Sequence, residues 1–236
     1  MSQYHLLGPD GQQVSYQLEQ RPRRTVGLKI TSDGLIVHAP KGIGEAELQR
    51  MLLSKWSWIV DKLAQQSSRQ VQEVQWRDGE SLLLLGKTVY LDIVEDSVNR
   101  QAKQEGNVIS LGVTDINNQA HIARKVLLWY RQFALQDFQR RIEIYAAKLA
   151  IPTPPVFLSN AKGRWGSCNS RHEIRLNWRL IQAPPALINY VVAHELAHTK
   201  QMNHSAKFWA IVEKLQPEYK QTEKALKDMA HQLHRI

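Results

Sequence analysis

The chain has 236 residues, of which 43% are hydrophobic, with 31 Lys and Arg against 22 Asp and Glu and a single cysteine. This length can bury a core without disulfide bonds, and one cysteine cannot form a disulfide within the chain, which excludes a disulfide-stabilised secreted scaffold. Neither a signal peptide nor an apolar run of roughly 20 residues is present, so we expect a cytoplasmic protein without a membrane partner.

The excess of positive charge lies entirely in the second half of the sequence. Residues 1–117 hold 13 Lys and Arg and 14 Asp and Glu, whereas residues 118–236 hold 18 and 8, giving net charges of −1 and +10. A basic surface attracts phosphates, nucleic acid or acidic substrates. The alternative is a solvated basic face that has no partner.

Short strands around one helix are expected in the first part of the chain. Two runs that favour strands, 24–31 and 35–40, flank the turn Ser32-Asp33-Gly34 and predict a hairpin. Apolar residues then recur at helical spacing, which predicts one helix from Glu45 to Gln66.

A second hairpin and a further strand complete this part. The runs 81–85 and 88–94 are joined at Gly86-Lys87, and 107–113 has the composition of a strand. No His, Cys, Asp or Glu stands at ligand spacing here. We therefore interpret residues 1–116 as a β-rich structural or substrate-presenting module.

From residue 117 onward the pattern predicts a helical domain with a small antiparallel sheet. Apolar residues from Ile122 to Leu149 indicate one long helix, which must end before Pro152. Strands are expected at 156–159 and 173–181, on either side of a glycine-bearing loop.

Three helices follow these strands. Proline opens the helix 186–199, Ser205 is the expected N-cap of 206–215, and 217–234 forms the last helix. The expected fold class is therefore α+β, with the N-terminal module 1–116 followed by a second domain, 117–236.

Two histidines on the helix after Pro185 stand at metal-ligand spacing. His194 and His198 are four residues apart, so their imidazoles project from one helix face. Glu195 is placed beside a metal rather than toward it, where it can accept a proton from water. His204 supplies a third imidazole, which leaves one tetrahedral position open. The pattern predicts one catalytic Zn²⁺ per chain, against the alternatives of a surface histidine pair and a loop histidine.

Several segments, taken together, resemble a known family. They are Arg164–Cys168, Ile174–Asn177, Tyr190–His198 and Asn203–Trp209, together with the pattern from Arg23 to Trp58. In these segments the chain resembles the YgjP-like metallopeptidase family of the zincin clan, which is distantly similar to SprT-like and WLM proteases, over roughly residues 20–236. The resemblance implies a zincin-like catalytic domain and a zinc-dependent hydrolase. The ligands would be His194, His198 and His204, with Glu195 as the base.

The hairpin before the active-site helix carries further candidate residues. Arg164, Asn177 and His172 could bind substrate or hydrogen-bond a developing oxyanion, or they could only stabilise the turn. The strand 173–181 could pair with an extended peptide. Cys168 is either an extra ligand or redox switch, or a small buried thiol.

Peptide or protein hydrolysis is the first functional hypothesis. The alternative is a metal-dependent nucleoside triphosphate pyrophosphatase, an activity that has also been attributed to YgjP-like proteins. Basic residues around the motif could clamp phosphates, but the sequence has no P-loop and no carboxylate-rich ligand set. A third hypothesis is a protease that the basic half tethers to nucleic acid, although no nucleic-acid-binding motif accompanies the charge.

Overall fold

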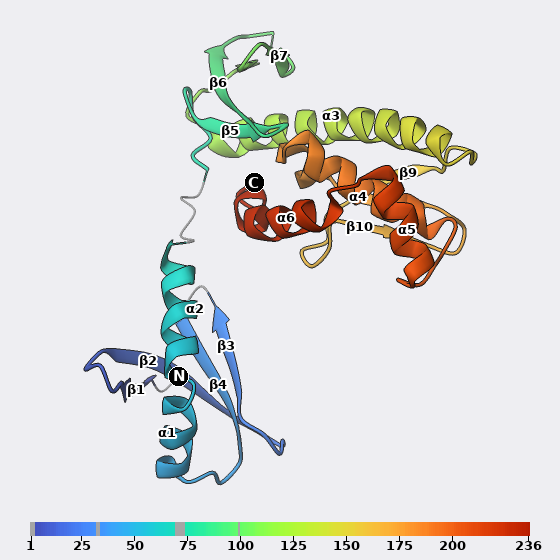
Figure 1. The fold of residues 1–236 in the computed structure, drawn as a ribbon. Coiled ribbons are helices and arrows are strands. Elements are labelled where there is room, and N and C mark those ends of the chain that lie inside the picture. Colours follow the sequence, from blue (N-terminus) through green and yellow to red (C-terminus); the bar gives the residue numbers. More distant parts are fainter. Residues whose placement is uncertain (1–2, 32–33, 69–73, 99) are drawn as a thin grey trace. The chain divides into compact units, whose positions relative to one another are not determined.

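The chain divides into two compact units, each with a hydrophobic core of its own (Figure 1). The first unit is Met1–Val71 and the second is Gln72–Ile236. The computed structural model describes residues 3–31, 34–68, 74–98 and 100–236, with no account of the side chains of 65–68. Within that part of the chain, no helix is both long and apolar enough to span a bilayer.

The first unit is a four-stranded sheet packed against two helices (Figure 1). Alternate residues of the central strand β4, Leu35, Val37 and Ala39, are buried beneath Leu52 and Ile59 of the helices. The strand order is β1-β2-β4-β3. The elements are β1 (Gln3–Leu7), β2 (Gln13–Arg21), β3 (Gly27–Thr31), β4 (Gly34–Pro40), α1 (Glu45–Leu53) and α2 (Trp56–Ser68).

The hairpin expected in the first unit is present, whereas the single expected helix is divided in two. The hairpin is present, because β3 and β4 pair antiparallel, although Ser32 and Asp33 of its turn lie outside the described residues. The single helix expected from Glu45 to Gln66 is instead the pair α1 and α2. Its interruption has a local cause, since the Ser54 hydroxyl donates to the Met51 carbonyl (2.7 Å) and competes with the helical hydrogen bonds.

The second unit begins with a four-stranded sheet that packs against one long helix (Figure 1). Strand β6 pairs antiparallel with β5 and parallel with β8. The strand order is β5-β6-β8-β7. The elements are β5 (Ser81–Leu84), β6 (Lys87–Glu95), β7 (Lys103–Glu105), β8 (Val108–Val113) and α3 (Gln119–Lys148).

The sheet β5–β8 therefore lies in the same compact unit as the helices that follow it. The expected division after residue 116 differs from the compact-unit boundary after Val71 because this sheet and α3 share one core. The fully buried Tyr130 of α3 donates its hydroxyl to the Leu83 carbonyl (2.9 Å). The Leu85 amide donates to the Ile181 carbonyl (2.8 Å), which joins the sheet to the next part of the chain.

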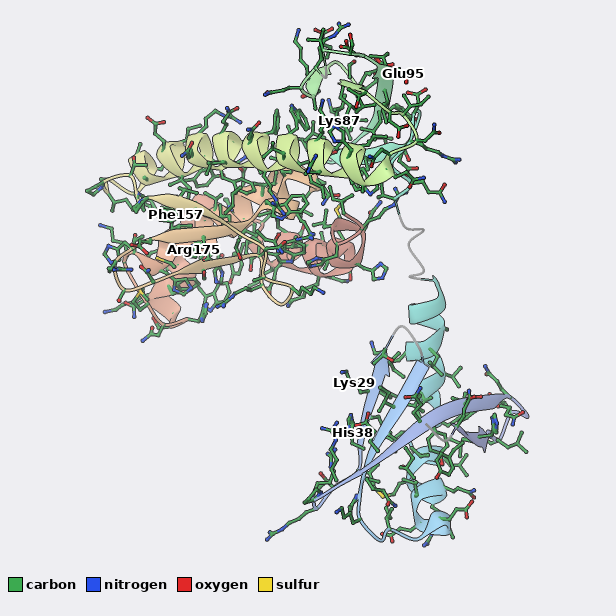
Figure 2. The ribbon with its side chains drawn as sticks, turned by 180° about the vertical axis from the view of Figure 1, so that it is seen from behind. Lys29, His38, Lys87, Glu95, Phe157 and Arg175 are labelled. Carbon is green, nitrogen blue, oxygen red and sulfur yellow. The ribbon has the colours of Figure 1, made fainter. Side chains whose placement is uncertain are left out.

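A small three-stranded sheet precedes the last helices. Strand β9 (Val156–Ser159), β10 (Gly166–Cys168) and β11 (Ile174–Asn177) are ordered β10-β11-β9. The sheet is mixed rather than antiparallel, since β11 pairs antiparallel with β10 but parallel with β9. On its exposed face, the Arg175 guanidinium lies 5.0 Å from the Phe157 ring (Figure 2).

The strand expected at 173–181 ends early. After Asn177 the chain enters a 3₁₀ helix, η1 (Trp178–Gln182), because the Asn177 carboxamide oxygen accepts from the Arg179 amide (3.1 Å) and caps the helix. The remaining elements are α4 (Pro185–His198), α5 (Ala206–Leu215) and α6 (Tyr219–Leu233). The architecture confirms the α+β class, with a strand-rich beginning followed by a mainly helical part.

Candidate metal centre

Helix α4 brings two histidines and one glutamate to the same end of the second unit. Pro185 occupies its first turn, where a missing amide costs nothing, and Val192 and Ala193 are completely buried behind the motif. His194 and His198 lie one turn apart on the same face, with ring centroids 5.1 Å apart. The helix ends at His198, which frees the following residues to turn back toward it.

The third histidine reaches this face from the loop between α4 and α5. His204 Nε2 lies 3.1 Å from His194 Nε2, and the potential ligand atoms of His194, His198 and His204 all lie within 4.8 Å of one another. Among the residues that the structure describes, these are the only three His, Cys, Asp or Glu side chains found in such a group. The structure thus brings together all three of the expected ligands.

Aromatic packing and one backbone contact orient the imidazoles. The Phe208 ring lies 4.6 Å from the rings of His198 and His204 and 4.9 Å from that of His194. Nδ1 of His198 contacts the Gln201 carbonyl (3.3 Å), which leaves its Nε2 free for the cluster. The three rings are therefore held in place by the fold.

The electrostatics of the cluster favour neutral imidazoles. Burial, together with the nearby His198 and His204, lowers the pKa of His194 to about 4. Burial is also the largest cause that lowers the pKa of His198. Neutral imidazole is the form that binds a metal ion. Nδ1 of His194 is buried without a hydrogen-bond partner, so the ring is not engaged in an alternative polar network.

Glu195 follows His194 on α4 and is almost completely buried. Only 5% of its surface is exposed, and burial raises the pKa of its carboxyl group to about 8, while the charge of Arg164 opposes that rise. Strand β10 passes directly over the carboxyl group. A Cβ atom at Gly166 would lie 2.6 Å from Cγ and 2.7 Å from Cδ of Glu195. A buried carboxyl group with a raised pKa beside three imidazoles is suited to proton transfer.

A family model now adds to this geometry. The model of the YgjP-like metallopeptidase domain matches residues 24–229. The chain belongs to the YgjP-like metallopeptidase family. No curated protein matches the chain.

Two solved structures are similar to part of this YgjP-like chain. One is the metallopeptidase zymogen abylysin of Pyrococcus abyssi, which is 23% identical with a TM-score of 0.36 and covers 39% of this chain and 93% of its own. The other is the metallopeptidase zymogen jannalysin of Methanocaldococcus jannaschii, which is 20% identical with a TM-score of 0.35 and covers 39% and 94%.

The three residues that the sequence predicts as possible substrate or oxyanion contacts have different surroundings in this family member. Arg164 is exposed and close enough to Glu195 to affect its pKa. Asn177 is completely buried, and its carboxamide group is used within the fold, since Nδ2 donates to the Ala161 carbonyl (2.8 Å) while the oxygen caps η1. The Asn177 carboxamide is therefore hydrogen-bonded within the fold, and its expected contact with substrate stays a prediction. His172 occupies the exposed β10–β11 turn with φ of 59°.

Cys168 lies on β10, on the same strand as Gly166. It is partly buried and is not part of the group of potential ligands. Burial, together with the charge of Glu195, raises the pKa of its thiol to about 11. A protonated thiol is a poor nucleophile and a poor ligand, which favours the packing role.

Sequence reasoning missed two features of the site. Gly166 controls the space around the Glu195 carboxyl group, and β10 rather than β11 is the edge strand beside α4. The glycine in the loop 162–168 was visible, but its contact with a helix almost thirty residues later was not. Strand order is likewise a property of the folded sheet rather than of a single strand.

Replacing Gly166 by alanine tests the close approach of β10 to the glutamate. The added methyl group would push the Glu195 carboxyl group aside, and a displacement of about 1 Å at a reacting group can lower the rate about 100-fold. We expect Gly166→Ala to reduce peptidase kcat/KM by about this factor while metal content is retained. The matched control is Gly163→Ala, because a Cβ there has no neighbour within 4 Å. Equal activities of the two variants would contradict this role.

Proposed function

We propose that this YgjP-like protein is a zinc-dependent peptidase with one metal ion per chain. His194, His198 and His204 would hold the ion, and Glu195 would act as the general base. The observation that carries the proposal is the convergence of three imidazoles within 4.8 Å beside a carboxyl group that is only 5% exposed.

The donor set fits zinc. Three nitrogen donors and no carboxylate are typical of Zn²⁺ rather than Mg²⁺ or Ca²⁺, which prefer oxygen ligands. When bound, zinc would polarise the scissile carbonyl group and lower the pKa of water at the site. A nearby dication would also lower the pKa of Glu195 below its value of about 8, which keeps the carboxylate available as a base.

Two side chains would supply proton transfer and charge stabilisation. The Glu195 carboxylate would accept a proton from the attacking water, and the resulting carboxylic acid would donate that proton to the leaving amine, so the same carboxyl group serves both steps. Arg164 lies near enough to stabilise negative charge on this side of the site. Because Glu195 is nearly inaccessible to bulk solvent, the proton stays with the reacting groups.

Strand β10 is the part of the sheet that can align an extended peptide. It pairs only with β11 among the described strands, so one of its edges carries free backbone groups beside α4. The sequence predicts that the segment 173–181 could pair with a peptide. Strand β11 of this segment is enclosed between β10 and β9, so it has no free edge for a peptide. An edge strand that touches Glu195 favours a peptide substrate over a nucleotide.

The test is metal analysis of the purified protein together with hydrolysis of internally quenched peptides. We expect about one zinc ion per chain and peptide cleavage that a chelator abolishes and added zinc restores. Nucleoside triphosphates are assayed in parallel. Pyrophosphate release without any peptide cleavage would reject the peptidase proposal and support the nucleotide alternative.

A further inference from the structure

Basic side chains gather at one end of strand β10. They come from α3, from the loop between β9 and β10, from η1 and from the end of α6. Among the described residues, none of them forms an ion pair with an Asp or Glu side chain. We call this set the cationic band; its members are Arg131, Lys162, Arg164, Arg179, His231 and His234.

The inner part of the band is organised around His234. The His234 ring stacks on Trp165, the residue before β10, with ring centroids 4.9 Å apart and an angle of 26° between the planes. Burial lowers the pKa of His234, and the charges of Arg179, His231 and Lys162 lower it further. Each of these three groups therefore lies close enough to His234 to repel its protonated form.

The outer part of the band surrounds one buried indole. The guanidinium groups of Arg131 and Arg179 lie 5.4 and 4.5 Å from the ring of Trp178. Burial lowers the pKa of Arg179, and the neighbouring Arg131 lowers it further. The Arg179 Nε donates to the Ile236 carbonyl group. These like charges repel one another, so an anion placed among them would be bound favourably.

The band approaches the catalytic centre at the Gly166 end of β10. Arg164 affects the pKa of Glu195, and Trp165 leads directly into Gly166, which touches the Glu195 carboxyl group. At the opposite end of β10, Arg171 is paired with Glu173 (Nε to Oε1, 3.4 Å). A peptide aligned along β10 would therefore meet the basic side chains of the band at its Gly166 end and the Arg171–Glu173 pair at the other.

We infer that the cationic band is a specificity subsite for acidic side chains of the substrate, on the side of the scissile bond next to the Gly166 end of β10. This inference rests on the proposed peptidase function. Nucleic acid fits the band less well, because base stacking needs a free aromatic face. Trp178 is only 2% exposed between two guanidinium groups, and His234 covers a face of Trp165.

The binding test uses zinc-loaded Glu195→Gln and rhodamine-labelled peptides, measured by fluorescence anisotropy. In one pair of peptides, three Glu or three Gln precede a central apolar segment; in the other pair they follow it. We expect the Glu peptide to bind about 10-fold more tightly than its Gln counterpart in one pair only, with the ratio falling as salt is raised. Equal Kd values for Glu and Gln in both pairs would overturn the inference.

Charge-reversal variants test whether the preference for the Glu peptide depends on the cationic band. We expect Lys162→Glu to reduce the 10-fold preference to about 2-fold or less and to leave the Kd of the Gln peptide unchanged. The matched control, Lys87→Glu, reverses an exposed lysine on β6 and should keep the full preference. The inference would also be overturned if Lys162→Glu and Lys87→Glu lost the preference for the Glu peptide to the same extent. Stronger competition by a single-stranded oligonucleotide than by the Glu peptide would overturn it as well.

Cleavage by the wild-type protein separates this inference from the proposed function. Selective binding of the Glu peptide without cleavage of any peptide would reject the peptidase function but keep the anionic subsite. Cleavage of Glu and Gln peptides with equal kcat/KM in both pairs would reject the subsite and keep the peptidase function.

Discussion

Glu195→Gln should abolish peptide hydrolysis while leaving the metal in place. The carboxamide cannot accept a proton from water, and the loss of a positioned general base typically lowers the rate 10²–10⁴-fold. Metal content should not change, because the ligand atoms belong to three imidazoles and not to this carboxyl group. The measurement is kcat/KM on a quenched peptide beside zinc content by elemental analysis.

The fold should tolerate this substitution well. Glutamine has the same shape under Gly166, and burial that raises the pKa of Glu195 to about 8 disfavours the charged form that the amide replaces. The apo variant should therefore unfold at a Tm no lower than that of the apo wild type. Activity of the metal-loaded variant at the wild-type rate would show that another group is the base.

His204→Ala should lose both the metal and the activity. Of the three expected ligands, His204 is the exposed one and comes from a loop, so its removal disturbs the core less than removal of the partly buried His194. We expect the metal content to fall from about one ion per chain to near zero, and peptide hydrolysis to fall to the background rate.

Thermal unfolding gives a second measure of the same change. A ligand at 1,000 times its Kd stabilises the folded state by about 4 kcal/mol, so excess zinc should raise the Tm of the wild type but not that of His204→Ala. The control is His172→Asn, which removes an exposed turn histidine and places at φ 59° a residue that accepts this conformation. Full metal content in His204→Ala would reject His204 as a ligand.

The geometry of the three histidines could be anticipated from the sequence because it depends on local structure. Spacing of four residues within a helix fixes the relative position of His194 and His198 whatever the rest of the fold does. His204 follows after a short loop, so its reach is limited to the same end of α4. Helix type and approximate limits were likewise accessible for α3 to α6, where apolar residues recur regularly.

Features that depend on distant partners could not be obtained in this way. The edge position of β10 depends on the pairing of β11 with both of its neighbours. The burial of Asn177 depends on the loop around Ala161, to which its side chain donates. Each of these contacts joins segments whose proximity appears only in the folded chain, so the sequence alone does not show that the Asn177 side chain is hydrogen-bonded within the fold.

Strands β1 and β2 were overlooked for a different reason. In β2, Val14, Tyr16 and Leu18 alternate with polar residues, which is the pattern of a strand with one buried face. The alternation therefore indicates a strand, but the serine and glutamine between the apolar residues give the segment a polar composition. Periodicity is the better guide here, because Val14 and Tyr16 are buried in the first core.

Because β5–β8 and α3 share one core, the shortest gene segment that encodes a folded second unit must include both. A gene fragment beginning at residue 117 would encode every expected ligand, yet it would uncover α3 residues such as Tyr130, which contact the missing strands. Recombination or domain shuffling would therefore need to carry the segment from about residue 74 onward. The sheet β5–β8 carries none of the expected ligands, yet it would be inherited together with the histidine-bearing helix as part of the same folding unit.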